Sequence, residues 1–194
     1  MTDDRETKHS DLPTALRIDN ATNAIIEASK VKKFIGPLIH NAHQRKVRRI
    51  VLLSWDNEEA TRVAGQLLAV AFSQQLEQKC ALIISEGIRY TCDNYESFNL
   101  IRLPEMSTAT DEENEKVLNE LDETYPFQII AGPTLNSWSK YSAHATTLAH
   151  AGDAHILLLP EGGLSRTIMK RIEKFSKEKK IKWLGIINIA RGNN

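Results

Sequence analysis

The most constraining feature of this sequence is a run of four apolar residues, Ile50 to Leu53, which is followed at once by a long helical pattern. A run without an internal polar residue is typical of a strand buried on both faces of a parallel sheet. Apolar residues then recur at helical spacing from Ala60 to Phe72, and a second apolar run spans Ala81 to Ile84. We therefore expect a strand, a helix and a strand, with a crossover long enough for parallel pairing.

The remainder of the chain repeats this rhythm of apolar runs and helical spacing. Five or six strands alternating with helices predict an α/β fold, a doubly wound and mostly parallel sheet with helices on both faces. Residues 1–18 hold few large apolar side chains and are predicted to be mobile, whereas residues 19–190 are predicted to form a single domain. The further strands are expected at 97–103, 127–131 (ended by Gly132-Pro133), 154–159 and 183–189, and the further helices at 20–35 (ended by Gly36-Pro37), 106–124, 136–150 and 165–179 (capped by Ser165).

Composition excludes several function classes. Lysine plus arginine equals aspartate plus glutamate at 25 each, so no global field favours nucleic acid or an anionic membrane. Cys80 and Cys92 are too few for a disulfide scaffold, which indicates a reducing cytoplasm. No apolar run approaches the ~20 residues of a membrane span, so the chain is expected to be soluble. All charged residues from Lys30 to Arg49 are basic; a solvated face and a docking surface for acidic protein or lipid headgroups both explain them.

Ligands of open parallel sheets bind at the carboxyl ends of the strands, so the loop after Leu53 decides most about function. A phosphate-binding loop needs glycines, a lysine and a hydroxyl. The segment from Ser54 to Thr61 reads SWDNEEAT, without glycine or lysine. Asp56, Glu58 and Glu59 stand where the helix dipole would attract phosphate, so we expect these carboxylates to cap the helix and to repel polyphosphate.

The other strand ends are weaker candidates. Glu86 is the carboxylate that follows the second strand, and Gly162-Gly163 form a glycine-rich turn that precedes a helix. A cation at Glu86 or a small anion at the glycines would make the chain an enzyme of unrelated mechanism, which is the alternative hypothesis. The histidine pairs His40/His43 and His144/His150 lack the carboxylate or cysteine that would complete a metal-ligand set. The residues thus predict no catalytic group, no metal and no cofactor.

The order and spacing of these elements resemble the cytoplasmic ATPase domain of bacterial tyrosine kinases, which work with polysaccharide co-polymerases in capsule and exopolysaccharide production. That family is close to the MinD and ParA ATPases. The segment from Leu68 to Gln74 is similar to the helix after the family's phosphate loop, and this register aligns the loop's Gly-Glu-Gly-Lys-Ser with Glu58, Glu59, Ala60, Thr61 and Arg62. In the family's second and third acidic motifs, Ser85, Gly87 and Ala131 replace the aspartates, while Glu27, Lys30 and Lys33 resemble its Glu-x-x-Arg-x-x-Arg oligomerisation motif.

The resemblance implies a P-loop NTPase-like three-layer α/β/α sandwich in which the catalytic lysine and the metal-binding aspartates are missing. It further implies a cytoplasmic, non-catalytic protein of exopolysaccharide or capsule biosynthesis, a pseudokinase held at the inner membrane by a partner. The expected partner is a polysaccharide co-polymerase or a kinase paralogue, and homo-oligomers through Glu27, Lys30 and Lys33 are expected as well. A ParA- or MinD-like positioning protein is a second alternative.

Overall fold

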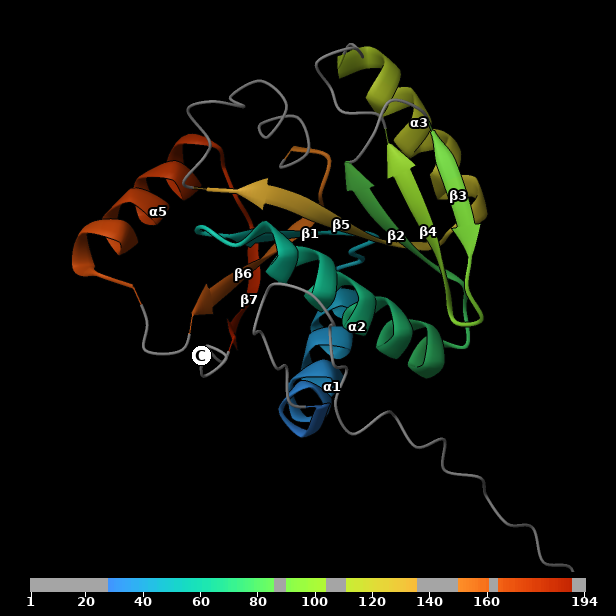
Figure 1. Cartoon of the computed structure of the whole chain (residues 1–194), viewed down its shortest axis with the longest axis horizontal. Coiled ribbons are helices and arrows are strands. Elements are labelled where there is room, and N and C mark those ends of the chain that lie inside the picture. The colour runs from blue at the N-terminus through green and yellow to red at the C-terminus, as the bar shows by residue number, and fades with distance from the viewer. Residues whose placement is uncertain (1–27, 86–89, 104–110, 136–149, 161–163, 190–194) are drawn as a thin grey trace, which may run out of the picture.

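The computed structural model describes residues 28–85, 90–103, 111–135, 150–160 and 164–189 (Figure 1). The segment predicted to be mobile, residues 1–18, lies outside these ranges, as does nearly all of the helix predicted at 136–150. The strands are β1 (Arg49–Ser54), β2 (Cys80–Ser85), β3 (Thr91–Asn94), β4 (Phe98–Leu103), β5 (Phe127–Thr134), β6 (Ala154–Pro160) and β7 (Trp183–Ile189); the helices are α1 (Ala28–Gln44), α2 (Glu58–Leu76), α3 (Asp111–Thr124) and α5 (Arg166–Glu178).

The strands form one seven-stranded sheet in the order β3-β4-β2-β5-β1-β6-β7. All neighbours are parallel except β3, which runs antiparallel to β4. The predicted α/β fold with a doubly wound, mostly parallel sheet is therefore confirmed. The first two strands do not pair directly, because β5 lies between β1 and β2 and pairs with both. This arrangement brings the carboxyl ends of β1 and β5 together.

Helices cover both faces of the sheet, which gives three layers (Figure 1). On one face α2 packs its buried side, including Leu68 and Phe72, against the strands, and α1 packs beside it through Leu38 and Ile39. On the other face α3 contributes Leu118 and Leu121, and α5 contributes Ile172. Both apolar clusters use alternate residues of the same strands, so the central strands are buried on both faces as their composition predicts.

Two predicted element ends are wrong. Gly36-Pro37 does not end a helix, since α1 continues through Pro37 to Gln44. The buried side chains of Leu38 and Ala42, placed beyond the proline, stabilise the continued helix by packing on the core. Gly132-Pro133 likewise does not end β5, which continues to Thr134. The pairing with β2 stops at Ala131, and the pairing with β1 shifts register between Leu52 and Ser54, so the proline lies where a missing N–H is tolerated.

The strand β3 was not predicted. Its four residues, Thr91 to Asn94, are all exposed, so they carry neither the apolar run nor the alternation by which a strand is recognised. It pairs with β4 at the edge of the sheet, where Arg102 forms an ion pair with Asp93. Among the described helices, none is long and apolar enough to cross a membrane.

Candidate functional site

The turn between β1 and α2 is the position at which a nucleotide would be expected, and it is short. Only Trp55, Asp56 and Asn57 lie between the two elements. Glu58 to Thr61, the second half of the segment compared above with a phosphate-binding loop, form the first turn of α2. Within the turn, the Ser54 hydroxyl donates a hydrogen bond to the Asn57 carbonyl at 2.6 Å. This bond ties the end of β1 to the residue that starts the helix.

Asn57 caps the amino terminus of α2. Its backbone is extended, and its Oδ1 accepts a hydrogen bond from the Ala60 N–H at 2.9 Å. We expected a carboxylate to cap this helix, and this prediction is wrong. The side-chain amide oxygen of Asn57 accepts the hydrogen bond from the free N–H group instead. Glu58 and Glu59 still lie in the first turn, where the helix dipole favours negative charge. The Glu58 carboxylate faces the Arg62 guanidinium at 3.7 Å.

Thr61, which the sequence resemblance aligns with the lysine of the kinases, is buried, and its side chain forms hydrogen bonds inside the protein. The residue is 0 % exposed. Its hydroxyl lies 2.6 Å from the Glu58 carbonyl, one turn back in the helix, and 3.1 Å from the Gly132 carbonyl at the end of β5. The side chain thus connects the first turn of α2 to the neighbouring strand and does not extend into solvent.

The end of β5 lies directly against the end of β1. A Cβ atom added at Gly132 would stand 2.6 Å from the Leu52 carbonyl oxygen, so only glycine allows this approach of the two backbones. The Leu135 N–H donates to the Ser54 carbonyl at 2.7 Å. Ala131, which the sequence resemblance aligns with the metal-organising aspartate of the kinases, is buried in the apolar core. The two strand ends are therefore joined by backbone contacts at the edge where ligands of such sheets bind.

These contacts define what the turn offers to a ligand. A phosphate site at a helix end depends on unpaired N–H groups and a nearby cation. Here the Ala60 N–H is engaged by the cap, and two glutamates occupy the first turn. Arg62 is the cation nearest in sequence, and its guanidinium pairs with Glu58. The described turn is acidic and internally hydrogen-bonded.

Few of the other predicted site residues are among those that the structure describes. Ser85 is half-buried at the end of β2. The backbone of Lys30 and Lys33 belongs to α1, but their side chains are not among those described. Within the described ranges, no group of three His, Cys, Asp or Glu residues is arranged to hold a metal ion. The remaining positions, Glu27, Glu86, Gly87, Gly162 and Gly163, lie outside the described residues.

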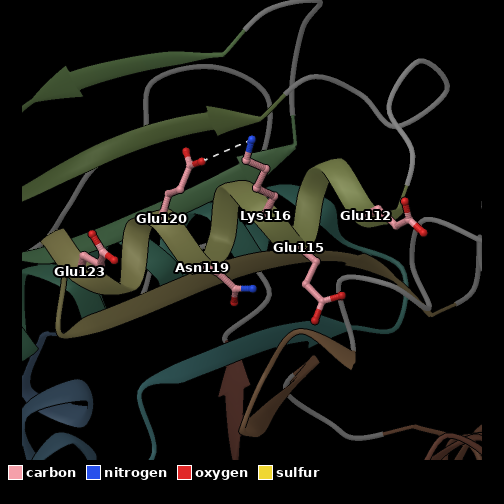
Figure 2. A pocket seen from close by; sticks show the side chains of 6 residues that line it. All are labelled: Glu112, Glu115, Lys116, Asn119, Glu120 and Glu123. Carbon is pink, nitrogen blue, oxygen red and sulfur yellow. Dashed lines mark ion pairs between the residues drawn. The ribbon is translucent and has the colours of Figure 1, made fainter.

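A hollow of about 400 Å³ lies elsewhere, on the exposed side of α3 (Figure 2). One ion pair crosses it, between Lys116 and Glu120 at 4.0 Å. The other charged groups are carboxylates, so the hollow is unsuited to anionic ligands such as nucleotides. All the lining side chains come from this single helix: Glu112, Glu115, Lys116, Asn119, Glu120 and Glu123.

Sequence reasoning missed three residues that shape the turn: Asn57, Gly132 and Leu135. The cap had a signal, because an asparagine directly before a helical pattern is a common N-cap. The contacts of Gly132 and Leu135 had no signal in the sequence. They depend on the pairing of β5 with β1, and these two strands are far apart in the sequence.

No protein-family model and no curated protein matches this chain, but solved structures do. The kinase domain of the Escherichia coli tyrosine kinase ETK is 12% identical over 92% of this chain and 84% of its own, with a TM-score of 0.69. The BceF tyrosine kinase domain is 13% identical over 85% of this chain and 77% of its own, with a TM-score of 0.65. The cell division protein MinD of Aquifex aeolicus is 11% identical over 73% of this chain and 68% of its own, with a TM-score of 0.52. The chain thus has the P-loop NTPase-like fold of these proteins.

Proposed function

We propose that this chain, which has the fold of bacterial tyrosine kinase domains, is a non-catalytic binding protein of exopolysaccharide or capsule production. It acts as a pseudokinase or pseudo-ATPase subunit that docks on a polysaccharide co-polymerase or on a kinase paralogue. The similarity of fold to the ETK and BceF kinase domains supports a role in the same kind of system.

One observation carries the non-catalytic part of the proposal. The buried Thr61 hydroxyl is 3.1 Å from the Gly132 carbonyl, and the sequence resemblance aligns this residue with the lysine that a kinase of this family extends toward phosphate. Phosphoryl transfer depends on positioning the phosphates and on neutralising their charge with a lysine and magnesium. A threonine that is hydrogen-bonded inside the protein supplies neither. Ala131, where the pairing of β5 with β2 stops, offers no carboxylate for magnesium.

The acidic first turn of α2 supports the same conclusion. A triphosphate that approached Asn57 would meet Glu58 and Glu59 within the same helical turn. Like charges repel, and this repulsion is strongest where solvent is displaced. The short turn of three residues also leaves no flexible loop that could fold around a phosphate chain.

The partner contacts are expected on the helix that contains Lys30 and Lys33, together with Glu27. Opposite charges on one helix can pair across a symmetric interface. Lysine lacks the bidentate fork of arginine, so contacts at these positions are weaker than in the resembled kinases. Through such a partner the protein is expected to act in the cytoplasm, at the periphery of the inner membrane.

The experiment that tests this proposal measures catalysis and partner binding on one purified preparation. Phosphate release from ATP with magnesium and autophosphorylation are expected to equal the background without protein. The cytoplasmic segment of a polysaccharide co-polymerase, or the kinase paralogue, is expected to bind saturably in a calorimetric titration. ATP turnover that Thr61→Val abolishes would refute the non-catalytic assignment, and absence of binding to both proteins would refute the partner assignment.

A further inference from the structure

The exposed side of α5 is strongly basic. The helix carries five basic and two acidic residues. Its apolar side, with Ile172 buried and Ile168 packed beside it, lies on the sheet. Arg166, Lys170, Lys174 and Lys177 recur at helical spacing on the opposite side, and all four are exposed. We call these four residues the basic stripe. Among the described residues, only its Lys174 is paired, with Glu178 at 3.7 Å.

The exposed side of α3 is strongly acidic. This helix carries seven acidic residues and one lysine. Leu118 and Leu121 bury its apolar side on the same face of the sheet that α5 covers. Glu112, Glu115 and Glu123 recur on the solvent side, which Figure 2 shows lined with carboxylates. We call these three residues the acidic stripe. Within the described part of the chain, none of the three takes part in an ion pair, so their charges are available to a partner.

The two stripes match in length but cannot meet within one copy. Each stripe extends over 11 residue steps, from Arg166 to Lys177 and from Glu112 to Glu123, which is about 16 Å of helix. The two helices cover the same face of the sheet at its opposite ends, α3 toward β3 and α5 toward β7 (Figure 1). The whole chain has no net charge, so the separation of charge between α3 and α5 makes the protein a dipole along the order of its strands.

We infer that the basic stripe on α5 of one copy binds the acidic stripe on α3 of a second copy. The observation that favours a second copy over another anion is the complementary charge and equal length of the two stripes. The contact is heterologous, because it leaves α3 free on one copy and α5 free on the other. It therefore continues to a closed ring or an open filament. This surface is separate from Glu27, Lys30 and Lys33, and it does not depend on whether the β1–α2 turn binds nucleotide.

A contact between two charged helix faces is small and exposed, so the association is expected to be weak and dependent on salt. Sedimentation velocity at about 0.01 M salt, where charges act over about 30 Å, is expected to give a mass that rises with concentration above the 21.9 kDa of one chain. At about 1 M salt, where the screening length is about 3 Å, the protein is expected to sediment as a single copy.

Two charge-reversed variants test the pairing of the stripes. The variant Lys170→Glu/Lys174→Glu/Lys177→Glu and the variant Glu112→Lys/Glu115→Lys/Glu123→Lys are each expected to be monomeric at low salt. When they are mixed, each reversed stripe meets a complementary stripe, so association is expected to return. A symmetric contact of α3 with α3, or of α5 with α5, would bring like charges together in the wild type, so it does not predict that the wild type associates at low salt. Reversal at two exposed positions outside the stripes, Lys79→Glu/Glu96→Lys, is expected to leave association unchanged.

Three results would overturn the inference. They are a wild-type protein that is monomeric at about 0.01 M salt, reversed variants that associate as the wild type does, and a mixture that stays monomeric. Circular dichroism and melting temperatures that equal those of the wild type show that the variants are folded. Binding of a monomeric wild type to vesicles that contain phosphatidylserine, lost on reversal of the basic stripe, would overturn it in favour of an anionic membrane.

Discussion

The Thr61 hydroxyl is the polar group that joins the first turn of α2 to the end of β5. Thr61→Val keeps the shape of the side chain and removes the hydrogen bond. We expect it to lower the free energy of unfolding by about 1–2 kcal/mol, because a buried carbonyl loses a donor. Urea denaturation measures this change. Thr167→Val, at an exposed position of α5, is the matched control and is expected to change stability by less than about 0.5 kcal/mol.

The two cysteines are expected to differ in reactivity. Cys80 is buried in the core, whereas Cys92 is exposed on β3. Burial raises the pKa of the Cys80 thiol from its ordinary value of 9.0 to about 12. Because the thiolate is the reactive species, a disulfide reagent near neutral pH is expected to modify Cys92 alone in the native protein and both thiols in denaturant. Rapid modification of both in the native protein would contradict the burial of Cys80.

The raised pKa of Cys80 also predicts how stability depends on pH. Between its ordinary value of 9.0 and about 12, the unfolded chain loses the thiol proton and the folded chain keeps it. Relative to a Cys80→Ala variant, the stability of the wild type is therefore constant below that window and falls as pH rises through it. The slope is at most about 1.4 kcal/mol per pH unit. Urea denaturation of both proteins across the window checks the sign.

At the scale of elements, two glycines are expected to respond in opposite ways to a methyl group. In β5, the Cβ of Gly132→Ala would stand 2.6 Å from the Leu52 carbonyl oxygen, so the strand ends must separate at a cost of about 1–3 kcal/mol. In α1, Gly36 has no atom within 4 Å of the added methyl, and alanine is expected to stabilise the helix by about 0.5–1 kcal/mol. Thermal unfolding of both variants compares them; a similar effect of both would contradict the close approach of β1 and β5.

The elements with continuous apolar patterns could be predicted from the sequence. The strands β1, β2, β6 and β7 and the helices α2 and α5 lie where the apolar runs and helical spacing indicate, and Ser165 caps α5 as expected. Two kinds of element end could not be predicted. Local sequence rules predict that a helix ends at Pro37 and a strand at Pro133. Packing on the core stabilises α1 beyond Pro37, and a shift of register between β1 and β5 accommodates Pro133. Tertiary contacts decided both.

The candidate site could be predicted in composition but not in geometry. The absence of glycine and lysine from Ser54 to Thr61 is visible in the sequence. That Asn57 is the cap, and that Thr61 contacts Gly132, depends on the length of the turn and on the place of β5 in the sheet. Strand order is not encoded in any local pattern, since β5 separates β1 from β2 although α2 connects them directly.

At the scale of the whole molecule, the fold shared with tyrosine kinase domains is combined with an acidic, internally hydrogen-bonded turn between β1 and α2. The seven-stranded sheet and its helices match the ETK kinase domain at a TM-score of 0.69. The shared architecture is the scaffold of the domain, while the proposed function depends on surfaces that bind other proteins. A measurement of nucleotide binding tests whether the shared fold has kept a nucleotide site, because a nucleotide that bound would stabilise the folded state.

The most direct measurement is the melting temperature of the purified protein with increasing ATP and magnesium, followed by a calorimetric titration of the same mixture. We predict no change in melting temperature and no saturable heat. A ligand at a hundred times its dissociation constant adds about 2.7 kcal/mol to the free energy of unfolding. A stabilisation of that size, with one ATP bound per chain, would contradict the claim that the β1–α2 turn is closed to nucleotides.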